Sequence, residues 1–284
     1  MTEQQNKVDY VKDTFAEYLG KKDYVSASEL KNFLKSPLTY YYDKYTEKER
    51  SDERHFSIGS ALHELILEPE LFKSNYIVSP KIDRRTKEGK AKFEEFTLSA
   101  QGKTILFEDE MDMIVKMANN AIVNHTFMEL LTDSYRELSC YTQDQKTGIK
   151  LRMRPDIMPK SKNTLVDIKS CLDSSPRMFK NNVYSYGYSI SAAFYCDYLK
   201  RENYVFAAIE KQAPYQASLY LLNDEMIEYG RTQYRMALDL LKWSMDNNYW
   251  CSYNEFEILK ECYHLGNLDE FMNVKESSQL ITIL

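Results

Sequence analysis

Hydrophobic residues recur at helical intervals through much of the first half of the chain. This spacing predicts helices within residues 1–25, 29–36, 58–68 and 109–131. Ser28 and Ser57 stand where N-caps are expected for the second and third of these helices. Pro37 and Pro69 stand where the same two helices should end. All four helices are expected to pack against a core.

Residues 81–92 interrupt this pattern with a run that is rich in lysine and arginine. The run contains Arg84, Arg85 and Lys90 and has little apolar content. Such a composition is typical of a solvated or mobile segment, and its positive charge also suits the phosphate backbone of nucleic acid.

The hydrophobic period changes to two after residue 136. Residues 137–143 and 149–157 alternate in hydrophobicity and flank the turn-forming residues 144–148. They are therefore expected to pair as an antiparallel hairpin. Three further strands are predicted at 164–170, 204–209 and 218–222, and the first of these should be more buried than the hairpin.

Helices are expected between and after these strands. One should begin with Ser175 as its N-cap and Pro176 in its first turn and run to residue 200. Another should begin at Asn223 or Asp224 and run to residue 247. We therefore expect a single α/β domain over 1–284, with an N-terminal helical addition at 1–55, a core at 56–250 and a C-terminal tail of uncertain structure at 251–284.

Composition excludes several classes of protein. A chain of 284 residues with 43% hydrophobic and 28% charged residues can bury a large core, which excludes a disordered or collagen-like chain. No run approaches the ~18 consecutive apolar residues of a membrane span, and the first ten residues lack an apolar signal core. We expect a cytoplasmic protein with no membrane partner. The net charge of −6 does not exclude nucleic acid, because a local basic surface is what binds it.

The five cysteines are expected to be free and mostly buried. They form no CxxC pair, and any disulfide scheme leaves one of them over. Zinc sites and iron–sulfur clusters need clustered thiolates, so neither is expected.

Charged residues gather on the predicted strands 149–157 and 164–170. Because side chains two apart share a face, Arg152, Arg154 and Asp156 should lie opposite an apolar face. The same rule places Asp167 beside Lys169, about 7 Å away, on an otherwise apolar strand. A charged pair there costs desolvation free energy unless a metal ion or an ion-pair partner binds it.

Pro155 should bring the Asp156 carboxylate toward Asp167. Proline has no amide hydrogen, so it should end or bulge the strand and turn Asp156 out of the regular sheet. Two converging carboxylates suit Mg²⁺ or Mn²⁺, and a neighbouring lysine can help to orient and deprotonate water beside a phosphate.

The order of these residues resembles the PD-(D/E)XK nuclease superfamily, in which Pro155-Asp156 and Asp167-Ile168-Lys169 would be the signature. The flanking sequence is similar to RecE-type, exodeoxyribonuclease VIII-like exonucleases of phages and prophages. The resemblance covers residues 26–200. It rests on ordered motifs: GSALHELILEP at 59–69, Glu137-Leu138-Ser139, Asp144 with Thr147-Gly148, Arg154-Pro155-Asp156, Asp167 to Ser170, and YGYSISAAFYCD at 186–197.

The resemblance implies a restriction-endonuclease-like α/β core, with a mixed central sheet flanked by helices and with helical additions. The implied metal ligands are His63, Asp156, Asp167 and the main-chain carbonyl of Ile168. The implied catalytic residues are Lys169, Glu137, Asp156 and Asp167. The implied cofactor is Mg²⁺, or Mn²⁺ in its place.

The residues expected to contact DNA are Arg84, Arg85, Lys90, Arg152, Arg154, Ser191 and Tyr195. The family usually has a glutamine where this chain has Ser191, followed four residues later by a tyrosine that is retained as Tyr195. Serine is too short to reach what glutamine reaches, so water or a neighbour substitutes, or activity is weaker or altered. Tyr184, Tyr188 and Tyr195 should share this helix face, where packing is a more common role than base stacking.

The resemblance implies a Mg²⁺-dependent exodeoxyribonuclease that degrades one strand of double-stranded DNA from the 5′ end and leaves a 3′ single strand for recombination. Expected partners are duplex DNA ends, a single-strand annealing protein and further copies of the chain in a ring, in the cytoplasm of a bacterial host. Two alternatives stay open. One is an endonuclease or single-strand nuclease on the same core, and the other, suggested by Ser191, is a non-catalytic DNA-binding accessory protein.

Overall fold

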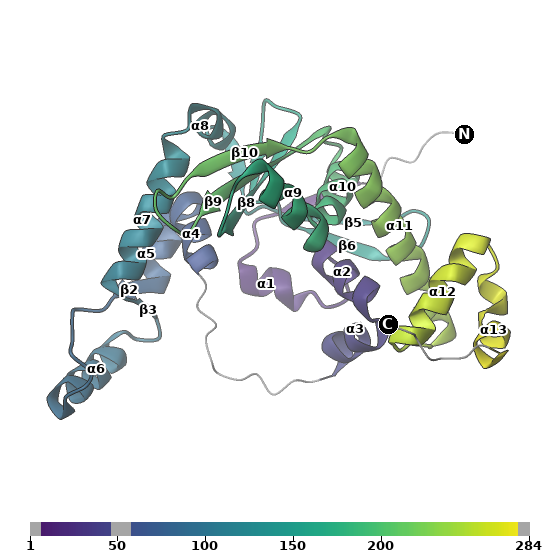
Figure 1. Ribbon diagram of the computed structural model, residues 1–284, viewed down its shortest axis with the longest axis horizontal. Coiled ribbons are helices and arrows are strands. Elements are labelled where there is room, and N and C mark those ends of the chain that lie inside the picture. Colours follow the sequence, from purple (N-terminus) through teal and green to yellow (C-terminus); the bar gives the residue numbers. More distant parts are fainter. Residues whose placement is uncertain (1–6, 47–57, 278–284) are drawn as a thin grey trace.

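A five-stranded mixed sheet forms the centre of the protein in the computed structural model, which describes residues 7–46 and 58–277 (Figure 1). Its strand order is β10-β9-β8-β7-β4. The central strands β8 (Thr164–Cys171) and β9 (Asn203–Glu210) run parallel. Antiparallel strands complete the sheet: β10 (Ala217–Leu221), β7 (Ile157–Pro159) and β4 (Ser134–Arg136). The expected mixed α/β architecture is confirmed.

Helices cover both faces of this sheet, because β8 sends apolar side chains to both sides. Leu165 joins a core cluster with residues of α2 (Ala27–Lys35), α10 (Tyr188–Leu199) and α11 (Asp224–Asn247). Val166 and Ile168 join a second cluster with residues of α4 (Ile58–Leu67), α7 (Glu108–Ile122) and α8 (His125–Leu131). Burial on both faces is usual for parallel strands. Asp167 and Lys169 are the two charged residues on β8.

The predicted hairpin is confirmed. Strands β5 (Ser139–Gln143) and β6 (Lys150–Met153) pair antiparallel, with Cys140 opposite Met153. A short N-terminal strand, β1 (Asp9–Val11), adds to β5 and makes a three-stranded sheet.

The N-terminal prediction of one helix within residues 1–25 is wrong, since the described part contains β1 and the short helix α1 (Phe15–Gly20). The N-cap of α2 is Ser26 and not Ser28, because Ser26 and Glu29 form a reciprocal capping box. Helix α3 (Pro37–Tyr45) follows directly. The predicted cap Ser57 lies outside the described residues.

The basic run is more regular than expected. Thr86 caps α6 (Lys87–Ser99), with its hydroxyl accepting a hydrogen bond from the Gly89 amide at 3.0 Å. Helix α6 follows α5 (Pro69–Asn75) and β2 (Tyr76–Val78), and β3 (Thr104–Leu106) returns beside β2. Figure 1 shows α6 projecting away from the sheet, so its basic residues lie on an arm.

Two predicted helices are each broken in two. The helix expected at 176–200 is α9 (Pro176–Ser185) followed by α10, because Gly187 adopts a left-handed conformation with φ of 60° between them. Tyr184 therefore does not share a helix with Tyr188 and Tyr195. The stretch 109–131 is α7 followed by α8, which is capped by Asn124.

The C-terminal stretch, which had no clear pattern, is helical as far as it is described. Helix α12 (Tyr253–Leu265) buries Phe256 and Leu259 in the cluster that contains Leu165. A short turn, η1 (Leu268–Glu270), leads to α13 (Phe271–Ser277). Helix α11 begins after Asn223, as predicted. All five cysteines are free, also as predicted. None of the helices in the described ranges is long and apolar enough to cross a lipid bilayer.

Candidate metal centre

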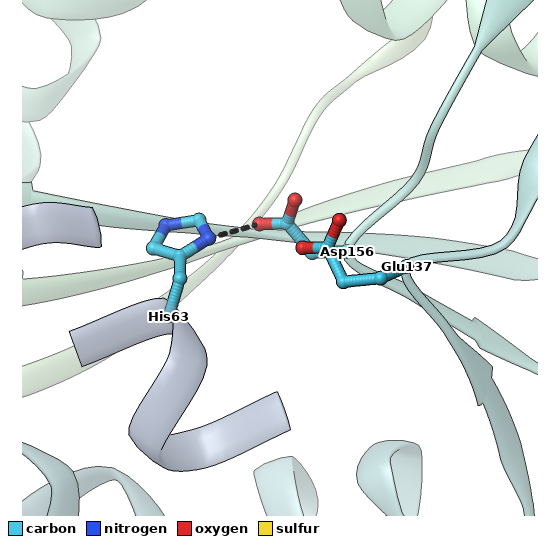
Figure 2. A group of neighbouring side chains, drawn as sticks. All are labelled: His63, Glu137 and Asp156. Atoms are coloured by element: carbon cyan, nitrogen blue, oxygen red, sulfur yellow. Dashed lines mark ion pairs between the residues drawn. The ribbon is translucent and has the colours of Figure 1, made fainter. Parts of the chain in front are cut away.

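Three potential metal ligands meet beside β8. His63, Glu137 and Asp156 each offer one ligand atom, and these atoms lie within 4.8 Å of one another. Figure 2 shows the His63 ring reaching from α4 toward the Asp156 carboxylate, with Glu137 beside it. Residues separated by up to 93 positions in sequence therefore share one site.

Asp156 is placed by the break between β6 and β7 that Pro155 was expected to cause. β6 ends at Met153 and β7 begins at Ile157, so Asp156 lies outside both strands. Its Oδ2 atom accepts a hydrogen bond of 2.7 Å from the amide of Ile168. The carboxylate is thus fixed against the middle of β8 and is almost fully buried.

The His63 ring bridges β8 and Asp156. Its Nε2 atom lies 2.8 Å from the Ile168 carbonyl oxygen, and its Nδ1 atom lies 3.4 Å from Oδ2 of Asp156. A carbonyl oxygen can only accept, so the neutral ring carries its hydrogen on Nε2. Nδ1 then presents a lone pair to a carboxylate oxygen. Two acceptors at this distance need a proton or a cation between them.

Asp167 and Lys169 form an ion pair on β8, as their spacing predicted. The Tyr204 hydroxyl donates to Oδ1 of Asp167 at 3.3 Å, and the Lys169 ammonium lies 5.3 Å from the centre of the Tyr188 ring. Asp167 is not one of the three clustered ligands. The third member of the cluster is instead Glu137, which the resemblance had implied as a catalytic residue and not as a metal ligand.

Glu137 occupies a strained position between β4 and β5. Its φ is 48°, in the left-handed region that non-glycine residues rarely adopt. Its amide donates to the Asp156 carbonyl at 3.2 Å, and its Oε2 accepts from Nε of Arg154 at 2.7 Å. These bonds aim the Glu137 carboxylate at the cluster. The alternating pattern at 137–143 gave no sign of this turn.

Burial and mutual repulsion disturb the protonation of the cluster. Burial, reinforced by the charge of Asp156, raises the pKa of Glu137 to about 7. Burial, reinforced by Asp167, raises the pKa of Asp156 well above its usual range. Burial and the charge of Lys169 lower the pKa of His63. Burial alone would lower the pKa of Lys169, but Asp167 and Asp156 outweigh it and raise that pKa. The carboxyl groups of Glu137 and Asp156 therefore keep their protons to a higher pH than exposed carboxyl groups do.

These residues fit a divalent cation. Two carboxylates, an imidazole nitrogen and a backbone carbonyl are ligands that Mn²⁺ accepts, and Mg²⁺ prefers the oxygens among them. A cation would separate the facing acceptors of His63 and Asp156 and would relieve the repulsion that raises the carboxyl pKa values.

The two arginines of the hairpin region that were predicted to bind DNA, Arg152 and Arg154, are largely used inside the protein. The Arg152 guanidinium is buried, donates to the carbonyls of Tyr18 and Leu19, and pairs with Glu29 at 3.0 Å. Arg154 donates to Glu137 and to the Ser139 hydroxyl. The N-terminal segment thus covers Arg152, on a strand face that alternation alone would leave open to DNA.

The other expected DNA contacts lie in different places. Tyr195 is partly buried, and its hydroxyl accepts from the Arg154 amide at 3.3 Å, while Ser191 lies one turn earlier on α10. Arg84 lies between the rings of Phe93 and Phe107, 4.8 Å from each centre. Arg85 pairs with Asp83, and Lys90 is exposed on the α6 arm. The structure does not bring the basic run to the metal centre.

Sequence reasoning missed Lys31, which comes from α2. Its ammonium lies 3.5 Å from the Tyr186 carbonyl and 5.9 Å from the centre of the Tyr188 ring, on which Lys169 also lies. Burial, followed by the charge of Lys169, lowers the pKa of Lys31 to about 8. In the sequence Lys31 is only one polar position of an amphipathic helix, so no signal could have placed it here.

Comparisons with known proteins agree with this architecture. The family model described as a PDDEXK-like domain of unknown function (DUF3799) matches residues 26–261. A candidate exonuclease from Eubacterium rectale superposes with a TM-score of 0.55 and 12% identity, over 84% of this chain and 88% of that chain. At that identity the likeness supports the fold and nothing finer. The predicted resemblance to the PD-(D/E)XK superfamily is confirmed.

More distant matches include an alkaline exonuclease from Laribacter hongkongensis, with a TM-score of 0.32 and 13% identity over 82% of this chain and 95% of that chain. A phage related exonuclease from Haemophilus somnus has a TM-score of 0.33 and 12% identity, over 79% of this chain and 96% of that chain. No curated protein matches the chain.

Proposed function

Because the chain belongs to the family of PDDEXK-like domains of unknown function, DUF3799, and because of the geometry of its polar centre, we propose that it is a metal-dependent deoxyribonuclease. The reaction is hydrolysis of DNA phosphodiester bonds. The cofactor is Mg²⁺, or Mn²⁺ in its place.

One observation carries this proposal: the carboxylates of Glu137 and Asp156 meet His63 beside β8, the strand that carries the ion pair of Asp167 and Lys169. Asp156 and Ile168 link the cluster to the Asp167–Lys169 pair through the 2.7 Å bond between Oδ2 and the Ile168 amide. Catalytic sites often hold carboxyl groups whose pKa values are raised by burial and by a neighbouring acid, as those of Glu137 and Asp156 are.

Each residue has a distinct task in this proposal. His63, Glu137, Asp156, Asp167 and the Ile168 carbonyl are the groups available to hold the metal. A bound divalent cation lowers the pKa of a coordinated water and polarises the phosphate. Lys169, held by Asp167, stays protonated and stabilises negative charge that develops on the phosphate, or orients the attacking water. Arg154 holds Glu137 in its strained position.

More specifically, we propose a 5′-to-3′ exonuclease that acts on duplex DNA ends in phage-type recombination. It includes further copies of the chain in a ring, a single-strand annealing protein as partner and the cytoplasm of a bacterial host as location. The basic α6 arm, with Arg84, Arg85 and Lys90, is the element proposed to contact duplex phosphates outside the centre.

A cleavage assay tests the proposal. Purified protein is incubated with linear duplex DNA labelled at one end, with closed circular DNA and with a single strand, each with Mg²⁺, Mn²⁺ or EDTA. Release of label from linear duplex alone, only with metal, is expected. Cleavage of the circle would replace the exonuclease reading by an endonuclease. Intact DNA under every metal condition, with binding retained, would leave a non-catalytic DNA-binding protein.

A further inference from the structure

Two cavities adjoin beside the candidate metal centre, at the junction of α4 and α5. The first, of about 360 Å³, is lined by His63 and Glu137 of the centre and by Arg154 and Phe15. The second, of about 460 Å³, is lined by Lys12, Tyr135 and Arg136. Both cavities are also lined by Leu67, Glu68 and Leu71. They form one groove, here called the β4 groove, which leads from the metal centre to the edge strand β4.

Three large apolar side chains are exposed along this groove. Phe15 is 61% exposed, Tyr135 is 47% exposed and Leu71 is 42% exposed. The Phe15 ring stacks at 6.4 Å on Tyr18, which is buried, so one face of Phe15 is supported by the core. Single exposed apolar residues are ordinary, but a series along a groove that begins at a reaction centre favours a ligand with flat apolar groups.

The two walls of the groove differ in charge. Lys12 and Arg136 stand on the wall formed by the N-terminal segment and β4, and Arg136 donates to the Leu131 carbonyl at 3.3 Å. The α4–α5 wall carries Glu64, Glu68 and Glu70. Glu70 is paired with Lys73, and Glu64 accepts from Asn75. A ligand with phosphates on one side and hydrogen-bond donors on the other would match both walls.

The volume of the groove favours a single strand over a duplex. Cavities of a few hundred Å³ each take one drug-sized ligand, which corresponds to nucleotides in single file. His63 belongs to α4, on one wall, and Glu137 directly follows β4, on the other, and Figure 2 shows both beside the Asp156 carboxylate. A strand in the groove would therefore pass directly into the centre.

We propose that the β4 groove binds one unpaired strand of DNA. Its bases lie on Phe15, Leu71 and Tyr135, and its phosphates face Lys12 and Arg136. Aromatic stacking combined with cations along the backbone is the usual way in which proteins hold single strands without sequence preference. The inference rests on the proposed function, and it adds that the nucleotides next to the cleaved bond are unpaired.

Binding without cleavage tests this inference. In a Lys169→Met background with Ca²⁺, a fluorescent 20-nucleotide oligothymidylate is titrated and anisotropy gives Kd. Phe15→Ala with Tyr135→Ala should weaken binding about tenfold. Lys12→Ala with Arg136→Ala should reduce the slope of log K against log salt by about 1.4, since each lost phosphate contact accounts for about 0.7. Both double variants should lose less affinity for duplex DNA of the same length than for the single strand.

The matched controls are Tyr253→Ala and Lys242→Ala, an exposed aromatic and an exposed lysine far from the groove on α12 and α11. Kd equal to the controls for both groove variants would overturn the inference, as would equal losses for duplex and single strand. Melting temperatures check that the variants fold.

Cleavage by the wild type is measured in parallel, so the two claims can fail separately. If the wild type cleaves DNA while the groove variants bind the single strand normally, the inferred role of the groove is wrong and the proposed function is supported. If the wild type never cleaves but the groove variants lose single-strand binding, the proposed function is wrong and the inferred role of the groove is supported. If the protein with an unaltered groove binds no single strand, the groove fails whatever the cleavage result.

Discussion

Two buried aspartates in this protein have opposite surroundings. Asp156 has one close donor, the Ile168 amide, and faces Glu137, Asp167 and the bare nitrogen of His63. Asp144 lies at the turn between β5 and β6. It accepts bonds from the Thr147 amide and hydroxyl at 2.8 and 2.7 Å, from the Tyr198 hydroxyl at 2.5 Å and from Arg235 at 2.7 and 3.0 Å.

The two carboxyl groups therefore respond oppositely to burial. At Asp156 burial and neighbouring acids raise the pKa. At Asp144 burial would also raise the pKa, but Arg235, Tyr198 and Thr147 outweigh it and lower the pKa far below its usual range. A saturated carboxylate stabilises the fold, whereas an unsatisfied one lowers stability and offers a place for a cation. Asp144 therefore has the surroundings of a structural residue, and Asp156 has those of a residue in a reaction centre.

The largest expected effect is on catalysis. Lys169→Met should reduce the cleavage rate by about 10³-fold, because the protonated ammonium stabilises charge in the transition state. Single-turnover rates on labelled duplex measure the effect. Lys146→Met is the matched control, since Lys146 pairs with Asp239 at 2.6 Å in the structural region. A Lys169→Met rate within threefold of the wild type would contradict the assignment.

The next effect is on stability at the structural aspartate. Asp144→Ala should lower the free energy of unfolding by about 3 kcal/mol, because it leaves Arg235 and Tyr198 without their acceptor. Urea denaturation followed by circular dichroism measures it. A loss below about 1 kcal/mol would show that this network is not the structural counterpart of the metal centre.

Urea denaturation of a variant at the metal centre should not show this loss in the free energy of unfolding. Asp156→Asn without metal should leave the free energy of unfolding unchanged or raise it by about 1 kcal/mol, because the amide keeps an acceptor for Ile168 and removes a repelled charge. Cleavage should be lost. A clear loss of stability would mean that the Asp156 carboxylate is structural, like that of Asp144.

The smallest expected effect is on the pH dependence of folding stability at acid pH. The pKa of Asp144 is lower in the folded chain than in the unfolded chain, so its stabilisation is complete above the usual carboxyl pKa, about 4. The stabilisation is lost as the pH falls through the folded value. The difference in melting temperature between wild type and Asp144→Asn should therefore be constant from pH 5 to 7 and narrow below about pH 4. A constant difference down to pH 3 would contradict this.

Sequence patterns predicted the elements whose local signals agree with their surroundings. Strand β8, the β5–β6 hairpin and the start of α11 at Asn223 follow from alternation, turn residues and capping. The resemblance had named His63, Glu137 and Asp156, which the structure brings together, and also Asp167 and Lys169, which pair on β8. Pro155 explains why Asp156 leaves the ladder.

The rest depends on contacts between distant segments. Alternation gives the face of Arg152 but not what covers that face, which is the main chain of Tyr18 and Leu19 more than 130 positions earlier. The left-handed conformation at Glu137 could not be predicted, because no glycine stands at that position. For the same reason no pattern could tell that the ligand atoms of Glu137, His63 and Asp156 would lie within 4.8 Å of one another.

Anomalous diffraction from a crystal soaked in Mn²⁺ would show whether the centre binds a metal ion. We expect one strong peak between His63 and Asp156, within about 2.0–2.6 Å of an Asp156 carboxylate oxygen. The peak should be absent in crystals of Asp156→Asn soaked in the same way. A wild-type crystal with no peak at this position, or with peaks only at surface carboxylates, would show that the cluster is not a metal centre.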